Sequence, residues 1–293
     1  PSIGEALGAL EVGGISLPIA LGLLVMLYPP LAKVRYDKTR EIATDKRLMS
    51  VSIVFNWLVG PAFMFALAWI FLPDQPELRT GLIIVGLARC IAMVLVWSDL
   101  SCGDREATAV LVAINSVFQV IMFGVLGWFY LQILPAWLGL ATTSAEFSFL
   151  SIVTSVLVFL GIPLLAGVLS RFIGEKTKGR SWYEDNFLPA ISPLALIGLL
   201  YTIVLLFSLQ GEQITSQPWT VARLAVPLLI YFVGMFALAL IASKVSGMNY
   251  AQSASVSFTA AGNNFELAIA VAVGTFGATS AQAPVSYTHL TLP

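Results

Sequence analysis

Charged side chains are scarce in this sequence of 293 residues. Asp, Glu, Lys and Arg make up 11% of the chain and hydrophobic residues 58%, whereas a soluble domain has about 25% and about 45–50%. The formal net charge of −1 argues against a nucleic-acid partner, because such partners attract strongly basic surfaces. Together with a mean hydropathy of +0.89, this composition predicts an all-α, polytopic membrane protein in a lipid bilayer.

Histidine and cysteine are nearly absent as well. His289 is the single histidine, and the two cysteines, Cys90 and Cys102, are too few for a disulfide framework. Hydrolysis by a histidine base and a histidine-ligated metal therefore lack their residues, and the sequence has no Gly-Lys-Ser/Thr phosphate loop. We expect no enzyme activity and no cofactor, and any pumping is expected to use an ion gradient or downhill flow.

Eight apolar stretches have about the 20 residues that a membrane-spanning helix needs. They lie at about residues 14–32, 48–72, 79–98, 107–131, 147–170, 188–209, 219–243 and 252–276. Of the 15 Lys and Arg residues, 12 fall in four connecting loops, at 33–47, 99–106, 171–187 and 244–251. Because cytoplasmic loops carry an excess of Lys and Arg, we predict that these four loops face the cytoplasm, in a cell inner or plasma membrane.

Polar residues interrupt the last apolar stretch. Gly262, Asn263 and Asn264 favour local unwinding, which bilayer depth tolerates only where the backbone is buried in protein or lines a wet cavity. Glu266 follows them. A carboxylate at this depth costs roughly 2.5 kcal/mol or more, so it is by default a functional group. A structural hydrogen-bonding role is the alternative.

A weak internal echo relates two parts of the chain. Residues 17–18 and 188–189 are both Leu-Pro, 171 positions apart, and residues 86–90 resemble 262–266 at a distance of 176. The members of each pair lie five apolar stretches apart, and an odd number inverts the second copy in the membrane. This is the inverted-repeat plan of secondary transporters, whose site lies at the bilayer midplane between two interrupted helices.

Three segments, 86–107, 113–120 and 255–278, resemble the arsenite efflux permeases of the arsenical-resistance type, within the bile acid/sodium symporter-like superfamily. The resemblance implies a secondary transporter that exports arsenite, or antimonite, with a membrane-embedded cysteine and glutamate as its functional pair. These map onto Cys90 and Glu266. Exchange with protons is the expected coupling. A sodium-coupled organic-anion symporter of the same superfamily is the alternative.

The family has ten helices, so the resemblance makes the eight stretches its second to ninth. The chain is therefore expected to lack the first and last helices, with a transporter domain over residues 1–284. Residues 285–293 do not resemble the family and are expected to be a non-native tail. The oligomeric state is left open by the sequence.

Cys90 and Glu266 have distinct expected roles. Trivalent arsenic and antimony are soft, so one thiolate binds them reversibly whereas three would trap them. Arg89 favours the thiolate of the adjacent Cys90, although a lone cysteine also fits a small buried hydrophobe. Glu266 is expected to carry the coupling proton. For Arg89 two interpretations are open: an ion pair with Glu266, or capping of the carbonyls of its own broken helix.

Four amide side chains complete the predicted substrate site. Asn263 and Asn264 either orient the hydroxyls of the substrate or only interrupt the helix. Asn115 and Gln119 are four residues apart and hence on one helical face, where they either contact the substrate or hydrogen-bond between helices. A kink is expected at Pro61, beside the site.

Overall fold

The computed structural model describes residues 11–12, 15–34, 42, 44–91, 93–141, 149–216 and 218–276. Within these ranges the protein is helical, apart from connecting segments and a two-residue antiparallel pair formed by β1 (Glu11–Val12) and β2 (Ile15–Ser16). The predicted tail at 285–293 and most of the predicted loop at 33–47 lie outside them. Five continuous helical stretches are long and apolar enough to cross a membrane, which confirms the all-α, polytopic fold.

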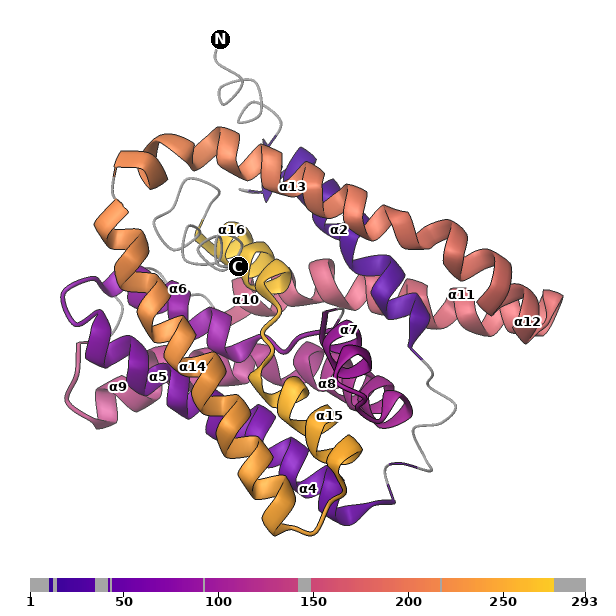
Figure 1. Cartoon of the computed structure of the whole chain (residues 1–293). Helices are drawn as coiled ribbons and strands as arrows, with labels where there is room; N and C mark the ends of the chain where they lie inside the picture. The colour runs from indigo at the N-terminus through magenta and orange to yellow at the C-terminus, as the bar shows by residue number, and fades with distance from the viewer. Residues whose placement is uncertain are drawn as a thin grey trace.

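Six helical segments, some built from several elements, run without a break, and two further ones are interrupted (Figure 1). The continuous ones are α2 (Leu17–Lys33), α4–η2–α5 (Lys46–Val54, Phe55–Val59, Gly60–Phe71), α8–η3–α9 (Arg105–Trp128, Phe129–Ile133, Leu134–Trp137), α10–η4–α11 (Phe149–Val156, Leu157–Gly161, Ile162–Lys178), α12–η5–α13 (Arg180–Trp182, Tyr183–Phe187, Leu188–Ser216) and α14 (Pro218–Val245). The interrupted ones are α6 (Pro76–Leu87) with α7 (Met93–Leu100), and α15 (Tyr250–Ala261) with α16 (Phe265–Phe276). The two predicted interruptions are thereby confirmed.

Each of the four elements written η is a π-helical turn, and a proline follows each of them two residues later. These prolines are Pro61, Pro135, Pro163 and Pro189. Proline has no N–H, and its ring clashes with the carbonyl four residues before it, so the preceding turn widens. In η2, for example, the Gly60 N–H bonds to the carbonyl of Phe55, five residues back. The kink expected at Pro61 thus takes the form of a π turn.

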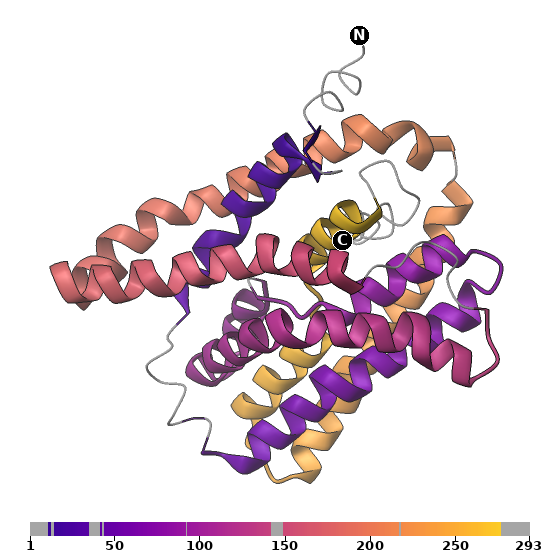
Figure 2. The ribbon, with the colours of Figure 1, turned by 180° about the vertical axis from the view of Figure 1, so that it is seen from behind.

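The helices form two groups, seen from opposite sides in Figures 1 and 2. In one, α2 packs along α13 and α11; in the other, α4, α5, α8 and α14 pack around the interrupted helices. Glycines allow the close packing in the first group: a Cβ at Gly198 would lie 2.8 Å from the backbone N of Met26, and one at Gly167 2.9 Å from that of Ala32. Small residues at helix contacts are typical of membrane proteins.

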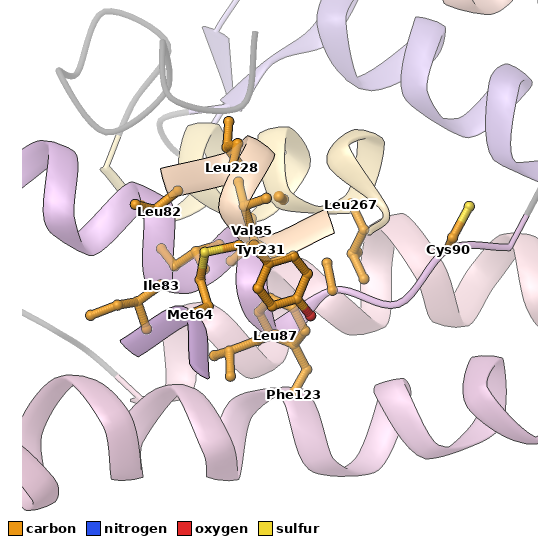
Figure 3. Packing of buried hydrophobic residues seen from close by; sticks show 14 of the residues in the cluster. Met64, Leu82, Ile83, Val85, Leu87, Cys90, Phe123, Leu228, Tyr231 and Leu267 are labelled. Carbon is orange, nitrogen blue, oxygen red and sulfur yellow. The ribbon is translucent and has the colours of Figure 1, made fainter. Parts of the chain in front are cut away.

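The second group contains the main hydrophobic core (Figure 3). Helix α6 lies at its centre, because every residue from Leu78 to Leu87 is buried. A helix that is apolar and buried on all sides has no outward face and is held by neighbours all round. Its C-terminal end, where the chain leaves the helical conformation, is therefore enclosed by protein, as a break at bilayer depth requires.

Helices of the first repeat contact helices of the second. The contacts join α2 with α13, α5 with α14, and α6 with α16. Helix α6 ends at Leu87 and α15 ends at Ala261, 174 residues later. The sequence analysis gave an offset of 176 residues between these parts of the two repeats, because it matched Gly86 with Gly262. This register is wrong. Gly86 lies inside α6, where a Cβ would collide with Met64, whereas Gly262 is the first residue after α15.

Candidate functional site

The two interrupted helices meet at their breaks. Helix α6 is followed by Ala88 and α15 by Gly262, both in extended conformation with ψ angles of 122° and 135°. The next residues, Arg89 and Asn263, form an isolated antiparallel β bridge. Segments that lie more than 170 positions apart in the sequence are thus paired backbone to backbone.

Two hydrogen bonds flank this bridge. The Cys90 N–H donates to the Gly262 carbonyl at 3.2 Å, and the Asn264 N–H donates to the Ala88 carbonyl at 3.1 Å. A shift of 174 residues converts one bond into the other, so the local two-fold axis of the repeat passes through the bridge. Each break supplies hydrogen-bond partners that the other would lack, and unpaired backbone groups are costly away from water.

The main chain of Arg89 is also held by the side chain of Gln119, on α8. The Arg89 N–H donates to Gln119 Oε1 at 2.7 Å, and Gln119 Nε2 donates to the Arg89 carbonyl at 3.2 Å. Both residues are fully buried. One amide therefore satisfies both backbone groups of Arg89, which corresponds to the interhelical hydrogen-bonding interpretation of Gln119. A substrate contact of Gln119 stays a prediction.

The guanidinium of Arg89 is 0% exposed and lies among uncharged oxygens. Nη1 donates to the Tyr231 hydroxyl at 2.9 Å and to the Ala260 carbonyl at 3.4 Å, and Nη2 donates to the Gly86 carbonyl. Of the two interpretations for Arg89, these contacts correspond to the capping of carbonyls, from both broken helices. Glu266 is the second residue of α16, and its side chain lies outside what the structure describes, so the ion pair stays a prediction.

Gly60 and Tyr231 shape the space around this cation, and the sequence did not single out Tyr231. A Cβ at Gly60 would lie 2.8 Å from Arg89 Nη1 and 2.9 Å from the Tyr231 hydroxyl oxygen. Tyr231 is fully buried on the apolar helix α14. A tyrosine within such an apolar stretch could have indicated a hydrogen bond at this position, because a buried phenol usually has a hydrogen-bond partner.

Cys90 extends from the break on the far side of this cluster. Its side chain is 8% exposed, and Figure 3 shows it pointing away from Leu87 and Tyr231. A Cβ at Gly262 would lie 2.8 Å from the Cβ of Cys90 and 3.6 Å from its Sγ. The absence of a side chain at Gly262 therefore makes room for the thiol against the other break.

Buried amide groups extend the polar surroundings of the breaks. Asn264 Oδ1 accepts the Leu267 N–H at 2.9 Å and so caps α16, and Asn115 Oδ1 accepts the Trp57 indole N–H at 3.1 Å. Both amide atoms of Asn263, and the Nδ2 atoms of Asn264 and Asn115, have no partner among the described residues. Buried polar atoms normally bond to protein or water, so these amides suit a wet or ligand-binding region.

The structure brings together six of the seven predicted site residues, within the limits of what it describes. Arg89, Cys90, Asn263 and Asn264 lie in the two paired breaks, and Gln119 contacts Arg89 directly. Asn115 lies one turn before Gln119 on α8. The backbone of Glu266, the seventh, lies in the first turn of α16, two residues after the second break. The arrangement offers a single soft ligand beside a buried cation and several neutral hydrogen-bonding groups.

The chain matches the Sodium Bile acid symporter family over residues 20–217. It is 85% identical over 277 residues to "Arsenical-resistance protein Acr3" of Corynebacterium glutamicum, which covers 94% of this chain and 75% of that protein. It is 33% identical over 302 residues to "Uncharacterized transporter slr0944" of Synechocystis sp., covering 97% and 76%. A protein of Alkaliphilus metalliredigens, also named "Arsenical-resistance protein Acr3", is 32% identical over 290 residues, covering 96% and 79%.

The relatives align with almost the whole chain, and the family match at residues 20–217 takes in the first break together with Gln119. The chain therefore belongs to the sodium bile acid symporter family and, within it, to the arsenical-resistance permeases, as a multi-pass protein of the plasma membrane.

Proposed function

We propose that this protein exports arsenite from the cytoplasm, with Cys90 as the ligand of the metalloid. Arsenical-resistance transport is the function that the 85% identical relative supports. The observation that carries the finer proposal is the position of the thiol: Cys90 lies in a helix break that is hydrogen-bonded to a second break. We call the place where the two breaks meet the crossing. Substrate sites of inverted-repeat transporters are built at such crossings of interrupted helices.

The chemistry of the site suits reversible capture of a trivalent metalloid. A soft thiolate binds arsenic or antimony, and a single one releases it more readily than a cage of three. Among the described residues, no group of three or more His, Cys, Asp and Glu side chains lies together. The amide groups of Asn263, Asn264 and Asn115 are available to hydroxyls on the metalloid. Antimonite fits the same chemistry as a second substrate.

Proton exchange is the proposed coupling, with Glu266 as the carrier. Glu266 is the second residue of α16, which begins directly after the second break. A carboxyl group next to such a site can exchange a proton when access alternates between the two sides of the membrane. The loops at 33–47, 99–106, 171–187 and 244–251 then face the cytoplasm, the side from which arsenite is taken up. The names of the relatives do not favour a sodium-coupled organic-anion symporter.

The test is arsenite transport in everted membrane vesicles, with and without a pH gradient, for the parent protein and its Cys90→Ser variant. We expect Cys90→Ser to lower the rate of arsenite transport by at least roughly 10–100-fold. This is the loss that follows when the supporting groups of a metal site are removed. Cys102→Ser is the matched control, because Cys102 is an exposed thiol in the turn before α8.

Unchanged transport in Cys90→Ser would refute the ligand role. Collapse of the pH gradient is expected to slow transport by the parent protein. A Glu266→Gln variant whose transport still depends on the pH gradient would remove the proposed role of Glu266 without affecting that of Cys90.

A further inference from the structure

The guanidinium of Arg89 lies where the C-terminal ends of two helices converge. Its backbone acceptors, the carbonyls of Gly86 and Ala260, belong to the last turns of α6 and α15. They are 174 positions apart, so they are equivalent groups in the two repeats. The cation thus lies close to the local two-fold axis.

These two carbonyls lose their helical partners because of the breaks. In a continuous helix, the Cys90 N–H would bond to Gly86 and the Asn264 N–H to Ala260, four residues back. Both N–H groups instead donate across the crossing, to Gly262 and Ala88. Two carbonyls at negative helix ends therefore face one position, and each end carries the equivalent of about half an elementary charge.

A pair of helix C-terminal carbonyls at a transporter midplane is a cation-binding arrangement. In transporters with broken helices, such carbonyls and the adjoining unwound backbone coordinate the coupling sodium ion or proton. We propose that the Arg89 side chain is a tethered cation that occupies this position permanently, so that transport needs no alkali cation. This inference rests on the proposed transport function and specifies its ion requirement.

The packing around Arg89 supports a permanent occupant. Gly60 leaves the space that the guanidinium fills, and the Tyr231 hydroxyl accepts from Nη1 at 2.9 Å. The planar fork of an arginine side chain can serve several acceptors at once. Each described acceptor is an uncharged oxygen, so the cation compensates the two helix ends directly.

The first arm of the test uses the unaltered protein. Arsenite transport in vesicles prepared in sodium, potassium or choline salts is expected to agree within about twofold, since no site for a mobile alkali cation is left at the crossing. Transport that requires sodium or potassium would overturn the inference.

The second arm measures thermal unfolding of purified protein and needs no arsenite, so it stays informative if the transport proposal fails. Arg89→Ala is expected to lower the unfolding midpoint by about 5 °C or more in choline chloride. Adding guanidinium or sodium chloride, on the order of 10 mM, is expected to raise it again by about 2–4 °C, because an ion that binds only the folded state stabilises it.

Arg79→Ala is the matched control. Arg79 is also buried and donates to two carbonyls, those of Leu72 at 3.2 Å and Pro73 at 3.0 Å, but these belong to one helix end outside the crossing. Its midpoint is expected to fall without becoming dependent on sodium. An Arg89→Ala midpoint that responds to neither ion, or an equal sodium response in both variants, contradicts the inference.

Arg89→Lys keeps the test open if Arg89→Ala does not fold. Lysine retains a tethered cation with three donors. Its midpoint is expected to be indifferent to sodium, like that of the parent protein, and a sodium-dependent midpoint in this variant would count against the inference.

Discussion

The two breaks share one backbone geometry and differ in chemistry. Both leave the helix in extended conformation, and two equivalent hydrogen bonds pair them. The first break presents a cation and a thiol, whereas the second presents two neutral amides. The repeat therefore supplies a symmetric frame, which an inverted-repeat transporter uses in both of its orientations. The reactive groups occur on that frame only once.

The breaks also differ in what holds them. The first break is held from outside by Gln119, whose amide binds both backbone groups of Arg89. The second has a cap of its own, since Asn264 accepts the N–H of Leu267. Replacing these two side chains separately measures how much each support contributes.

The largest effect is expected for Gln119→Leu. This change leaves the N–H and C=O of Arg89 unpaired in a fully buried place, which costs about 1–3 kcal/mol for each group. It is also expected to shift the first break, so the rate at which maleimide labels Cys90 in membranes should change together with the unfolding midpoint.

Gln252→Leu is the control for Gln119→Leu. Gln252 is only partly buried, and its amide donates to Asp45 at 3.3 Å. Labelling of Cys90 in this variant is expected to match the parent protein. Equal changes of the Cys90 labelling rate in the two variants would mean that Gln119 does not specifically position the thiol.

A smaller effect is expected for Asn264→Ala. The change removes the cap of α16 and costs about 1 kcal/mol of stability, as measured by chemical or thermal unfolding. Asn264→Asp keeps an oxygen acceptor for the Leu267 N–H and should preserve the cap. If the aspartate variant loses as much stability as the alanine variant, the side-chain amide of Asn264 serves another partner.

The smallest effect is expected far from both breaks, at Asp74→Asn. Asp74 lies in the turn between α5 and α6, is 56% exposed and pairs with Arg223, whose Nη1 donates at 2.8 Å. The hydrogen bond from Arg223 lowers the pKa of Asp74 below its ordinary value. The pair therefore stabilises the fold above the pKa of the unfolded state, and this contribution is lost as the pH falls through the depressed pKa.

Unfolding of the parent protein and Asp74→Asn at several acidic pH values checks this. The stability difference is expected to be small at neutral pH, to shrink in high salt because exposed ion pairs are screened, and to vanish in acid. A difference that grows as the pH falls would contradict the direction of the pKa shift.

Much of the fold could be predicted from composition and spacing. Apolar length predicted the helices, and Gly262 with its two asparagines predicted a break because these residues are poor helix formers in an apolar stretch. The register of the repeat could not be predicted from matching letters. Glycine serves close packing at Gly86 and makes room for a thiol at Gly262, and the sequence does not distinguish the two.

The site could be predicted in part. Arg89 and Cys90 stood out as a charge and a thiol in an apolar stretch. That the Gln119 amide binds the Arg89 backbone was not predictable, because an amide on a helix face fits interhelical bonding and substrate contact equally well. Tyr231 comes from a helix with no other polar residue nearby, and only the packing of α14 brings its hydroxyl to Arg89.

The π turn ahead of Pro61 contains one residue more than an α-helical turn, and this insertion rotates everything after it by about 100° around the helix axis. Ser52 marks the buried face before the turn. In an unbroken α-helix that face would continue at Val59, whereas the insertion brings Gly60 onto it. Pro61 therefore affects the crossing indirectly. The π turn that it causes rotates the helix so that Gly60, which has no side chain, lies next to the guanidinium of Arg89.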